Sequence, residues 1–405
     1  MEDEISPKIK CENVWKVFGP TAEDIIKNWD QYKEMNKVER LAKTGCVVGT
    51  REASFQIQQG EIFCLMGLSG SGKSTLLRCI NRLHEPTAGK VIIDGQDITA
   101  LSGLDLRKVR REKMGMVFQH FALLPHRRLV ANAGFGLEIQ GVSKKECEKK
   151  AYEALELVGL KGWEKSYPFE LSGGMQQRVG LARALATNPE ILLMDEAFSA
   201  LDPLIKRQMQ DEFVKLIKKV KKTIVFVTHD LHEALRIANH IAIMKDGAIV
   251  QQGTPSQIVL KPAKGYVEEF VQDLPKTKFI TAQDIMDSPD DWLLPIGSSL
   301  QEILGKMNEK NLRFSFLVDE NGQIQETVDY FSVNSFVDSH QSVEDVPEGQ
   351  LSPHYQLESV TSDTFLESLL STAANTKVPI VVSDKQGKVQ GIISRETILS
   401  SLQSA

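Results

Sequence analysis

The hydrophobic pattern of this chain changes near Pro275. Before that point, apolar runs such as "EILLMDEAF" and "KTIVFVTHD" alternate with stretches of helical spacing such as residues 143–160. Runs that are apolar at nearly every position are typical of strands buried on both faces, and a repeated strand–helix order favours a mainly parallel sheet. The pattern therefore predicts an α/β domain that binds its ligands at the carboxyl ends of the strands.

The same periodicities predict further elements of this first domain. Residues 9–19 predict a strand, and residues 21–44 predict a helix with Thr21 as its N-cap. The segment 53–67, "ASFQIQQGEIFCLMG", alternates like two paired strands. A closing hairpin with an Asp-Gly turn is predicted from "HIAIMKDGAIVQQGTP".

After Pro275 the pattern is doubled. Residues 279–340 and 345–402 each predict helix, strand, turn, strand and helix, and such a repeat suggests that the two halves bury each other's faces. The first half departs from the second, because "VDYFSVNSF" stands where a return strand is expected. We accordingly divide the chain into a domain of residues 1–275 and a tail module of residues 276–405.

Composition changes this picture in two ways. Residues 276–405 hold 9 Lys and Arg against 19 Asp and Glu, a net charge of -10, which argues against a nucleic acid polymer as the tail's partner. The 405-residue chain has no apolar run long enough to cross a bilayer, its N-terminus lacks a secretory signal, and its five cysteines are scattered. We expect a reduced, cytosolic chain without a cysteine-based metal site.

One motif combines a glycine-rich turn with a lysine and a hydroxyl residue. Gly67-x-x-x-x-Gly72-Lys73-Ser74 follows an apolar run and precedes a helical stretch, which is the context that a phosphate-binding loop requires. The backbone N–H groups of such a loop bind phosphate together with the positive end of the following helix. Lys73 is expected to reach the β- and γ-phosphates of ATP, and Ser74 is expected to ligate Mg²⁺. The residues predicted to bind the nucleotide here are Gly67, Ser69, Gly70, Ser71, Gly72, Lys73, Ser74 and Thr75.

Polar side chains at the ends of later apolar runs extend the catalytic prediction. Asp195 ends "ILLMD" and is predicted to contact Mg²⁺, directly or through water. Glu196 follows and is predicted to orient or deprotonate the attacking water. Gln119 and His229 also end apolar runs, and such residues taken alone are more often caps than catalytic groups.

The segment 171–178, "LSGGMQQR", places a serine and two glycines at the start of a helix. Such a start is a second anion-binding end within one chain. A single chain cannot easily bring both ends onto the same γ-phosphate. Two chains arranged head to tail can do so, and a two-fold dimer makes the two sites alike.

Together these motifs resemble the ATP-binding cassette family over about residues 9–260. The resemblance implies that Gln119 senses the γ-phosphate or the metal and couples to a transmembrane partner, and that His229 holds the γ-phosphate. It also implies that Asp202, in "SALD", acts across the dimer and that Phe18, in "VWKVFG", stacks on adenine. The residues that the resemblance places against the opposite subunit's ATP are Ser172, Gly173, Gly174 and Gln176.

The fold that this resemblance implies is an ABC-type, RecA-like P-loop NTPase core with antiparallel β and helical subdomains, followed by an α+β tail. The helical subdomain is expected at about residues 119–170, where it receives a permease's cytoplasmic loop. An insertion at about residues 20–48 and its flanking motifs resemble the ATPase subunits of importers for glycine betaine, proline betaine and related compatible solutes. The tail resembles a tandem pair of cystathionine-β-synthase-type (CBS) domains, which implies a regulatory module.

The resemblance further implies a homodimer that binds ATP and Mg²⁺ and works in osmoregulation. Its expected partners are integral membrane permease subunits at the cytoplasmic face of a bacterial membrane, and a substrate-binding protein or domain that selects the solute. The tail is expected to bind an adenine nucleotide or a cyclic dinucleotide, or else to serve as a dimerisation module without a ligand. The alternatives for the whole chain are an importer of choline or carnitine, an export or release ATPase, a cassette that moves no solute, and an inactive nucleotide sensor.

Overall fold

The structure, a computed structural model, describes residues 6–119, 121–199, 201–272, 274–338, 343, 346, 350–351 and 357–403. Backbone contacts divide the chain into two compact units, Met1–Ile258 with Ala263–Phe270 and Val259–Pro262 with Val271–Ala405. The first unit holds the predicted phosphate loop and its partner motifs, and the second holds the doubled tail pattern.

The first unit is built around a six-stranded sheet with the order β10-β9-β3-β8-β7-β6. Its strands are β3 (Ile62–Met66), β6 (Met114–Val117), β7 (Ile191–Asp195), β8 (Thr223–Thr228), β9 (His240–Lys245) and β10 (Ala248–Gly253). Neighbouring strands are parallel from β9 to β6, and the edge strand β10 is antiparallel to β9. Every residue of β3, β7 and β8 is buried, which explains the apolar runs and confirms the predicted parallel sheet.

A second, antiparallel sheet has the order β2-β1-β4-β5. Its strands are β1 (Ile9–Phe18), β2 (Val47–Ile57), β4 (Ala88–Ile93) and β5 (Gln96–Asp97). The predicted pairing of two strands within residues 53–67 is wrong, because β2 pairs with β1 while β3 pairs with β8 and β9. Burial gives the reason. Along most of β2 exposed and buried positions alternate, as in a one-sided strand, whereas β3 is buried throughout and belongs in the middle of the other sheet.

Helix α3 (Lys73–Ile80) contacts strands of both sheets. Its Leu76, Leu77 and Ile80 are fully buried in the core that the sheets share. In that core Phe55 of β2 stacks on Phe63 of β3, with ring centroids 4.8 Å apart. This packing fixes the start of α3 close after β3, so the loop between them has a defined place at the carboxyl end of the parallel strands.

The insertion between β1 and β2 forms α1 (Ala22–Lys27), a 3₁₀ turn (Trp29–Gln31) and α2 (Lys37–Thr44). The predicted single helix over residues 21–44 is therefore wrong. Thr21 occupies the N-cap position of α1, as predicted, but its hydroxyl donates to Thr44 O at 3.3 Å and makes no capping hydrogen bond. Asn36 instead accepts from the Glu39 N–H at 2.9 Å and starts α2, because asparagine competes for backbone hydrogen bonds and favours a new N-cap over a helix interior.

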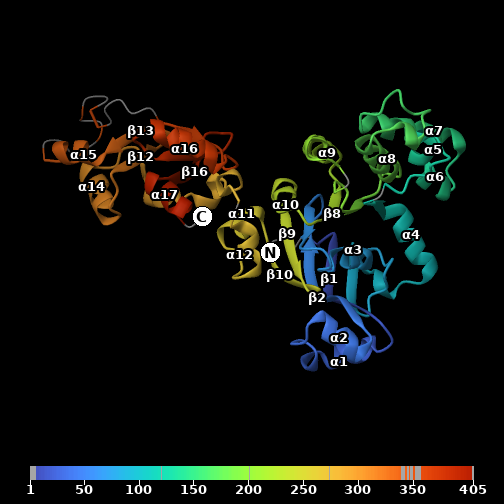
Figure 1. The fold of residues 1–405 in the computed structure, drawn as a ribbon. Helices are drawn as coiled ribbons and strands as arrows, with labels where there is room; N and C mark the ends of the chain where they lie inside the picture. The colour runs from blue at the N-terminus through green and yellow to red at the C-terminus, as the bar shows by residue number, and fades with distance from the viewer. Residues whose placement is uncertain are drawn as a thin grey trace. The chain divides into compact units, whose positions relative to one another are not determined.

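The remaining helices up to residue 271 are α4 (Gly103–Lys113), α5 (Leu129–Ala133), α6 (Phe135–Ile139), α7 (Lys144–Leu157), α8 (Gly173–Ala186), α9 (Pro203–Val220), α10 (Leu231–Ile237), α11 (Pro255–Leu260) and α12 (Tyr266–Val271). Helices α5, α6, α7 and α8 contact one another and form a helical group (Figure 1). The group includes α8, which carries the signature segment at its start.

The second unit repeats one arrangement of strands. Its elements are α13 (Ala282–Ile285), β11 (Leu293–Pro295), α14 (Leu300–Glu309), β12 (Phe314–Val318), β13 (Ile324–Asp329) and α15 (Tyr330–Phe336), then β14 (Ser359–Val360), α16 (Leu366–Asn375), β15 (Ile380–Ser383), β16 (Val389–Ile393) and α17 (Arg395–Gln403). In each half the first two strands are parallel and the last two are antiparallel. The doubled pattern predicted from the sequence is confirmed.

The first half differs from its prediction in one respect, because its return strand is present. β13 pairs with β12, so Val328 and Asp329 of "VDYFSVNSF" end a strand and the following residues form α15. The polar residues in "IQETVD" hid this strand from the hydrophobic pattern. As predicted, the two halves share a core, in which Phe314 and Phe316 of β12 meet Val378, Val381, Val389 and Ile392.

Candidate functional site

The loop between β3 and α3 has glycines where the chain is most crowded. Gly67 has φ +150° and Gly72 has φ +105°. A Cβ on Gly67 would lie 2.3 Å from Met244 O, and a Cβ on Gly72 would lie 2.1 Å from Gly49 O. A side chain at either position would push the loop away from the strands behind it, so the shape of the loop depends on these glycines.

Lys73 is buried within this loop, with 4% of the residue exposed, and its Nζ donates to Leu68 O at 2.9 Å. Burial lowers the pKa of the Lys73 ammonium group, and the nearby Glu196 and Asp195 act in the opposite direction. A desolvated cation gains strongly from an anionic hydrogen-bond acceptor. The surroundings of Lys73 are therefore suited to binding the β- and γ-phosphates.

Two observations indicate that ATP and Mg²⁺ fit at this loop. Ser71 Oγ is buried and has no hydrogen-bond partner among the described residues, and it lies 2.7 Å from the position of a Cβ on Gly67. Ser74 Oγ donates to Asp195 Oδ1 at 2.7 Å. An unpaired hydroxyl in a glycine-rich loop suits a phosphate oxygen, and two hard oxygen ligands side by side suit Mg²⁺.

Two more predicted nucleotide residues adjoin Gly49, directly behind the loop. A Cβ on Gly49 would lie 2.9 Å from Phe18 Cε2 and 2.8 Å from Thr75 Cγ2. Phe18 ends β1 and is 37% exposed. An aromatic ring left partly open beside the loop is suited to stacking on an adenine ring. The outermost predicted residues of the loop, both exposed, are Ser69 and Gly70.

Asp195 ends β7 with its side chain 6% exposed, and its carboxylate accepts two hydrogen bonds from α3. Besides the bond from Ser74, an N–H of Arg78 donates to Asp195 Oδ2 at 3.1 Å. Ser74 and Arg78 are four residues apart and share one face of α3. Arg78 belongs to none of the predicted motifs, and its four-residue spacing from Ser74 is the signal that could have found it.

Three predicted residues meet at one carboxylate. Gln119 Nε2 donates to Glu196 Oε2 at 3.2 Å, and His229 Nδ1 lies 3.6 Å from the same oxygen. The three residues follow β6, β7 and β8, which are neighbours in the parallel sheet. Glu196 has φ +46°, a strained left-handed conformation of the kind that collects at functional sites.

The segment after His229 is held by a residue that the sequence analysis did not single out. Lys206 Nζ, on α9, contacts Asp230 Oδ2 at 2.7 Å. Burial works to raise the pKa of the Asp230 carboxyl, but the hydrogen bond and the charge of Lys206 outweigh it and leave that pKa lowered. Asp202 caps the same helix by accepting from the Ile205 N–H at 3.1 Å. The two loops that contain Asp202 and His229 are thus connected through one turn of α9.

The signature segment is exposed at the start of α8. Ser172 is the N-cap, and its Oγ accepts from the Met175 N–H at 3.4 Å. Ser172 and Gly173 are exposed, while Gly174 is buried, and a Cβ on Gly174 would lie 2.9 Å from Ile205 Cγ2. Within the described parts of the chain, no hydrogen bond or ion pair joins this segment to the phosphate loop. The two predicted anion-binding ends are not joined by such bonds within one chain.

Two further residues of α8 hold neighbouring loops. Gln176 Nε2 donates to Pro168 O at 3.1 Å, so its amide shapes the turn before the signature. An N–H of Arg183 donates to Phe121 O at 2.9 Å, in the loop that follows Gln119. Arg183 was not predicted, because only the fold brings α8 beside that loop.

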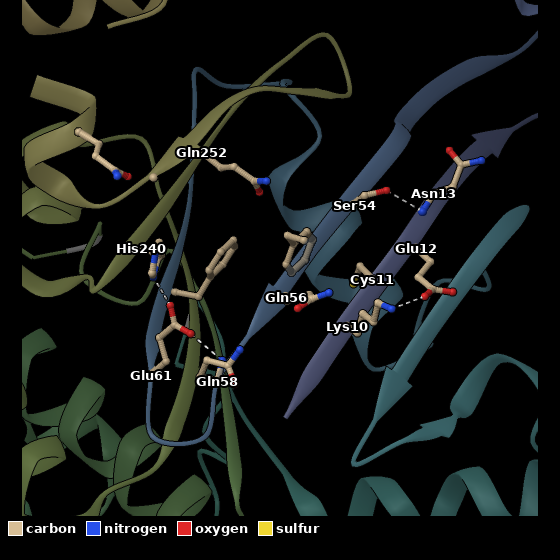
Figure 2. A pocket seen from close by; sticks show the side chains of 14 residues that line it. Lys10, Cys11, Glu12, Asn13, Ser54, Gln56, Gln58, Glu61, His240 and Gln252 are labelled. Atoms are coloured by element: carbon tan, nitrogen blue, oxygen red, sulfur yellow. Dashed lines mark hydrogen bonds and ion pairs between the residues drawn. The ribbon is translucent and has the colours of Figure 1, made fainter. Parts of the chain in front are cut away.

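A separate hollow of about 770 Å³ lies at the other end of β3, near the residues that precede this strand. Figure 2 shows its lining side chains, in which Glu61 contacts His240 and Lys10 pairs with Glu12. None of the predicted catalytic or nucleotide-binding residues lines this hollow. The residues of the phosphate loop, together with Gln119, Asp195, Glu196 and His229, lie instead at the carboxyl ends of β3, β6, β7 and β8.

Comparison with known proteins adds the family. The family model described as ABC transporter matches residues 50–199, and the model described as CBS domain matches residues 343–404. The glycine betaine/carnitine transport ATP-binding protein GbuA of Listeria monocytogenes is 46% identical over 396 residues, which cover 98% of this chain and 97% of GbuA. The glycine betaine transport ATP-binding protein OpuAA of Bacillus subtilis is 46% identical over 400 residues, which cover 99% of this chain and 93% of OpuAA.

A solved structure agrees with these relatives. The chain is similar to the ATP-binding cassette MJ0796 in a dimeric post-hydrolysis state bound to ADP and Pi, with a TM-score of 0.51 and 33% identity, over 61% of this chain and 98% of that one. In the described part of the chain, no helix is long and apolar enough to cross a membrane. The phosphate loop, the carboxylates that follow it and the two near-complete alignments lead to one conclusion: the chain belongs to the ATP-binding subunits of ABC transporters, which hydrolyse ATP to drive transport.

Proposed function

We propose that this chain powers the import of glycine betaine or a closely related compatible solute. The observation that carries the proposal is the extent of the alignments, since GbuA and OpuAA match the insertion and the tail as well as the cassette. The core cassette alone is common to many transporters and says little about the solute. The alignments with GbuA and OpuAA therefore rest on the tail and the insertion in addition to the cassette.

ATP is proposed to bind in the phosphate loop, with its adenine ring on Phe18. Lys73 supplies a buried cation to the β- and γ-phosphates, and Ser71 Oγ gains a partner in a phosphate oxygen. Ser74 and Asp195 are proposed to hold Mg²⁺, together with Gln119. When bound there, Mg²⁺ polarises the phosphate oxygens and offsets their negative charge.

Glu196 is proposed as the general base. Its Oε2 is proposed to accept a proton from the attacking water, and it accepts a hydrogen bond from Gln119 at 3.2 Å, while His229 Nδ1 lies 3.6 Å away. His229 is 53% exposed, so its ring is free to turn toward the γ-phosphate.

The working state is proposed to be a homodimer in which each signature closes the partner's site. Exposure of Ser172 and Gly173 supports this arrangement, and so does the dimer of the similar cassette MJ0796. The helical group α5–α8 is proposed to receive the permease at the cytoplasmic face of the membrane. Arg183 and Gln119 give that group a direct connection to the catalytic carboxylate, because Arg183 holds the loop that follows Gln119.

The test is ATP-driven uptake of labelled glycine betaine into vesicles that contain the cognate permease, at low and high internal salt. Uptake that requires ATP and rises with salt supports an osmoregulatory importer. Absence of uptake in both conditions, with ATP hydrolysis intact, keeps the ATPase and rejects the solute. Carnitine is the second candidate because GbuA is named for both solutes, and competition by unlabelled carnitine tests it in the same vesicles.

We also propose that the tail binds an adenine nucleotide or a cyclic dinucleotide. A cavity of about 700 Å³ is lined by residues of both halves of the second unit. Although the tail has a net charge of -10, this cavity has three cationic and two aromatic side chains against one carboxylate. The charged and aromatic residues that line it are Trp292, Arg313, Phe314, Lys377, Arg395 and Glu396.

Titration of the full chain with AMP and with a cyclic dinucleotide tests the tail proposal. Lys377→Gln should weaken binding about 3- to 10-fold, because it removes one cation from the cavity. Lys385→Gln is the control, since Lys385 is an exposed lysine of the same module that does not line the cavity. Equal affinities for these two variants would reject the cavity as the ligand site.

A further inference from the structure

The insertion between β1 and β2 carries a lysine to the phosphate loop. Lys37 Nζ lies 3.0 Å from Gly70 O and 2.9 Å from Asp246 Oδ1. Gly70 is an exposed residue of the loop, and Asp246 lies in the turn between β9 and β10. Three segments that are far apart in the sequence therefore meet at one ammonium group.

The position of Lys37 is fixed by the fold of the insertion. Lys37 is the first residue of α2, whose start is held by a capping box between Asn36 and Glu39. Arg40, on the next turn, is 6% exposed, and its guanidinium lies 4.7 Å from the centroid of the Trp29 ring. A helix held at its first turn and along its buried face has little freedom to swing, so it keeps Lys37 beside the loop.

The carbonyl that Lys37 holds belongs to the peptide between Gly70 and Ser71. The C=O and N–H of a trans peptide point in opposite directions, and the N–H of this peptide donates to Leu68 O at 3.1 Å, across the loop. A cation on the outer carbonyl therefore holds the N–H inward and polarises it toward an anion. The next carbonyl is held as well, because the Gly247 N–H donates to Ser71 O at 3.0 Å.

We propose that Lys37 is a positioning residue of the ATP site, which clamps the phosphate loop from outside and ties the insertion to nucleotide binding. Asp246 completes this outer clamp by keeping the ammonium group beside the Gly70 carbonyl. Lys37 acts through the loop and does not itself contact ATP. The inference rests on the ATP site proposed at residues 67–75.

The test compares Lys37→Gln with Lys27→Gln in the full chain by calorimetric titration with ATP and Mg²⁺. Lys27 is an exposed lysine of α1 whose nearest carboxylate, Glu23, lies 3.9 Å away. Loss of a charged hydrogen bond behind the loop should raise the Kd of Lys37→Gln about 3- to 10-fold. The Kd of Lys27→Gln should stay within about twofold of the wild type, because Lys27 pairs with a residue of its own helix.

Thermal melting separates positioning from a structural role. Without ATP, the two variants should melt together, and with ATP the Lys37→Gln variant should gain less stability than Lys27→Gln. If Lys37→Gln melts lower without ATP and gains as much from ATP as the control does, the role is structural and the proposal is wrong. Lys37→Arg should restore the Kd, because arginine can still donate to both acceptors.

A double-mutant cycle tests the clamp itself. Asp246→Asn should raise the Kd less than Lys37→Gln does, and the double variant should bind no worse than Lys37→Gln alone. Fully additive effects would overturn the clamp, and so would equal Kd values for Lys37→Gln and Lys27→Gln. Lys73→Ala tests the proposed ATP site separately from the proposed role of Lys37. If this variant binds ATP like the wild type, the ATP site is misplaced, and the inference on Lys37 fails with it.

Discussion

The two helix ends of this chain that are predicted to bind anions, at the phosphate loop and at the signature, are built in opposite ways. At the phosphate loop, Lys73 and Ser71 are buried, and the Gly70 carbonyl is hydrogen-bonded from behind. At the signature, Ser172 and Gly173 are exposed, and the Ser172 side chain bonds within its own helix. One end is complete within the chain, and the other faces solvent.

In the proposed homodimer, this difference divides the work between two copies of the chain. A loop that holds the charge of a triphosphate needs donors that are oriented before the ligand arrives, and bracing by the same chain provides them. In that dimer the signature surface closes and opens in every cycle, so breaking its contacts must cost little free energy. The signature therefore stays exposed and is fixed only by its helix cap. Substitutions that act on one end and spare the other test this division.

The largest effect is expected from Glu196→Gln, which should lower kcat for ATP by about 10²- to 10⁴-fold. The variant keeps the shape of the side chain and leaves the braced phosphate loop intact, so ATP should still bind and a closed dimer should accumulate. ATPase assays and gel filtration with ATP measure the two effects. Glu153→Gln is the control, because Glu153 is exposed on α7 and its ion pair with Lys149 spans 3.9 Å. Hydrolysis near the wild-type rate would remove Glu196 from the role of general base.

The second-largest effect is expected from a substitution in the signature, the exposed helix end. Ser172→Asp should lower ATP turnover by about 10- to 100-fold and abolish ATP-dependent dimers, because a carboxylate placed against the partner's γ-phosphate is repelled. Aspartate is itself a good N-cap, so α8 should remain intact. Binding of ATP to the single chain should stay close to wild type, since the phosphate loop is untouched.

The chain offers a matched control for this variant. Ser143 caps α7 and accepts from the Glu146 N–H at 3.4 Å, the same distance as from Ser172 to the Met175 N–H. Ser143→Asp makes the same chemical change on a helix that carries no predicted site residue. If Ser143→Asp lowers turnover as much as Ser172→Asp, the effect comes from charge in general, and the signature loses its proposed role at the dimer interface.

The phosphate-loop end could be predicted largely from the sequence, because the residues that matter there lie close together along the chain. Gly67, Gly72, Lys73 and Ser74 lie within eight residues, and their spacing alone predicts a turn, a cation and a metal ligand. The carboxylates were also predictable, since Asp195 ends a run that only a buried strand explains. The parallel sheet followed from the same apolar runs.

The contacts that hold the phosphate loop from outside could not be predicted, because they join segments that only the fold brings together. Lys37 precedes Gly70 by 33 residues, and Tyr266 follows Leu68 by 198, yet both contact the loop. Neither residue belongs to a motif. The misassigned helix over residues 21–44 has the same origin, since the separate start at Asn36 depends on a side-chain cap and not on periodicity.

The smallest effect is expected from Tyr266→Phe, which removes one oxygen behind the braced loop. The Leu68 N–H donates to Tyr266 Oη at 3.3 Å, and that hydroxyl is 3.5 Å from Met244 O. Loss of a long, partly exposed hydrogen bond should raise the Kd of ATP about twofold and leave the melting temperature without ATP nearly unchanged. Tyr152→Phe is the control, because Tyr152 is 40% exposed on α7, away from the loop. An effect of Tyr266→Phe as large as that of Lys37→Gln would mean that α12, and not the insertion, is the main brace. If Tyr266→Phe and Tyr152→Phe bind ATP equally well, the loop is braced at Gly70 and Ser71 without help from its first turn.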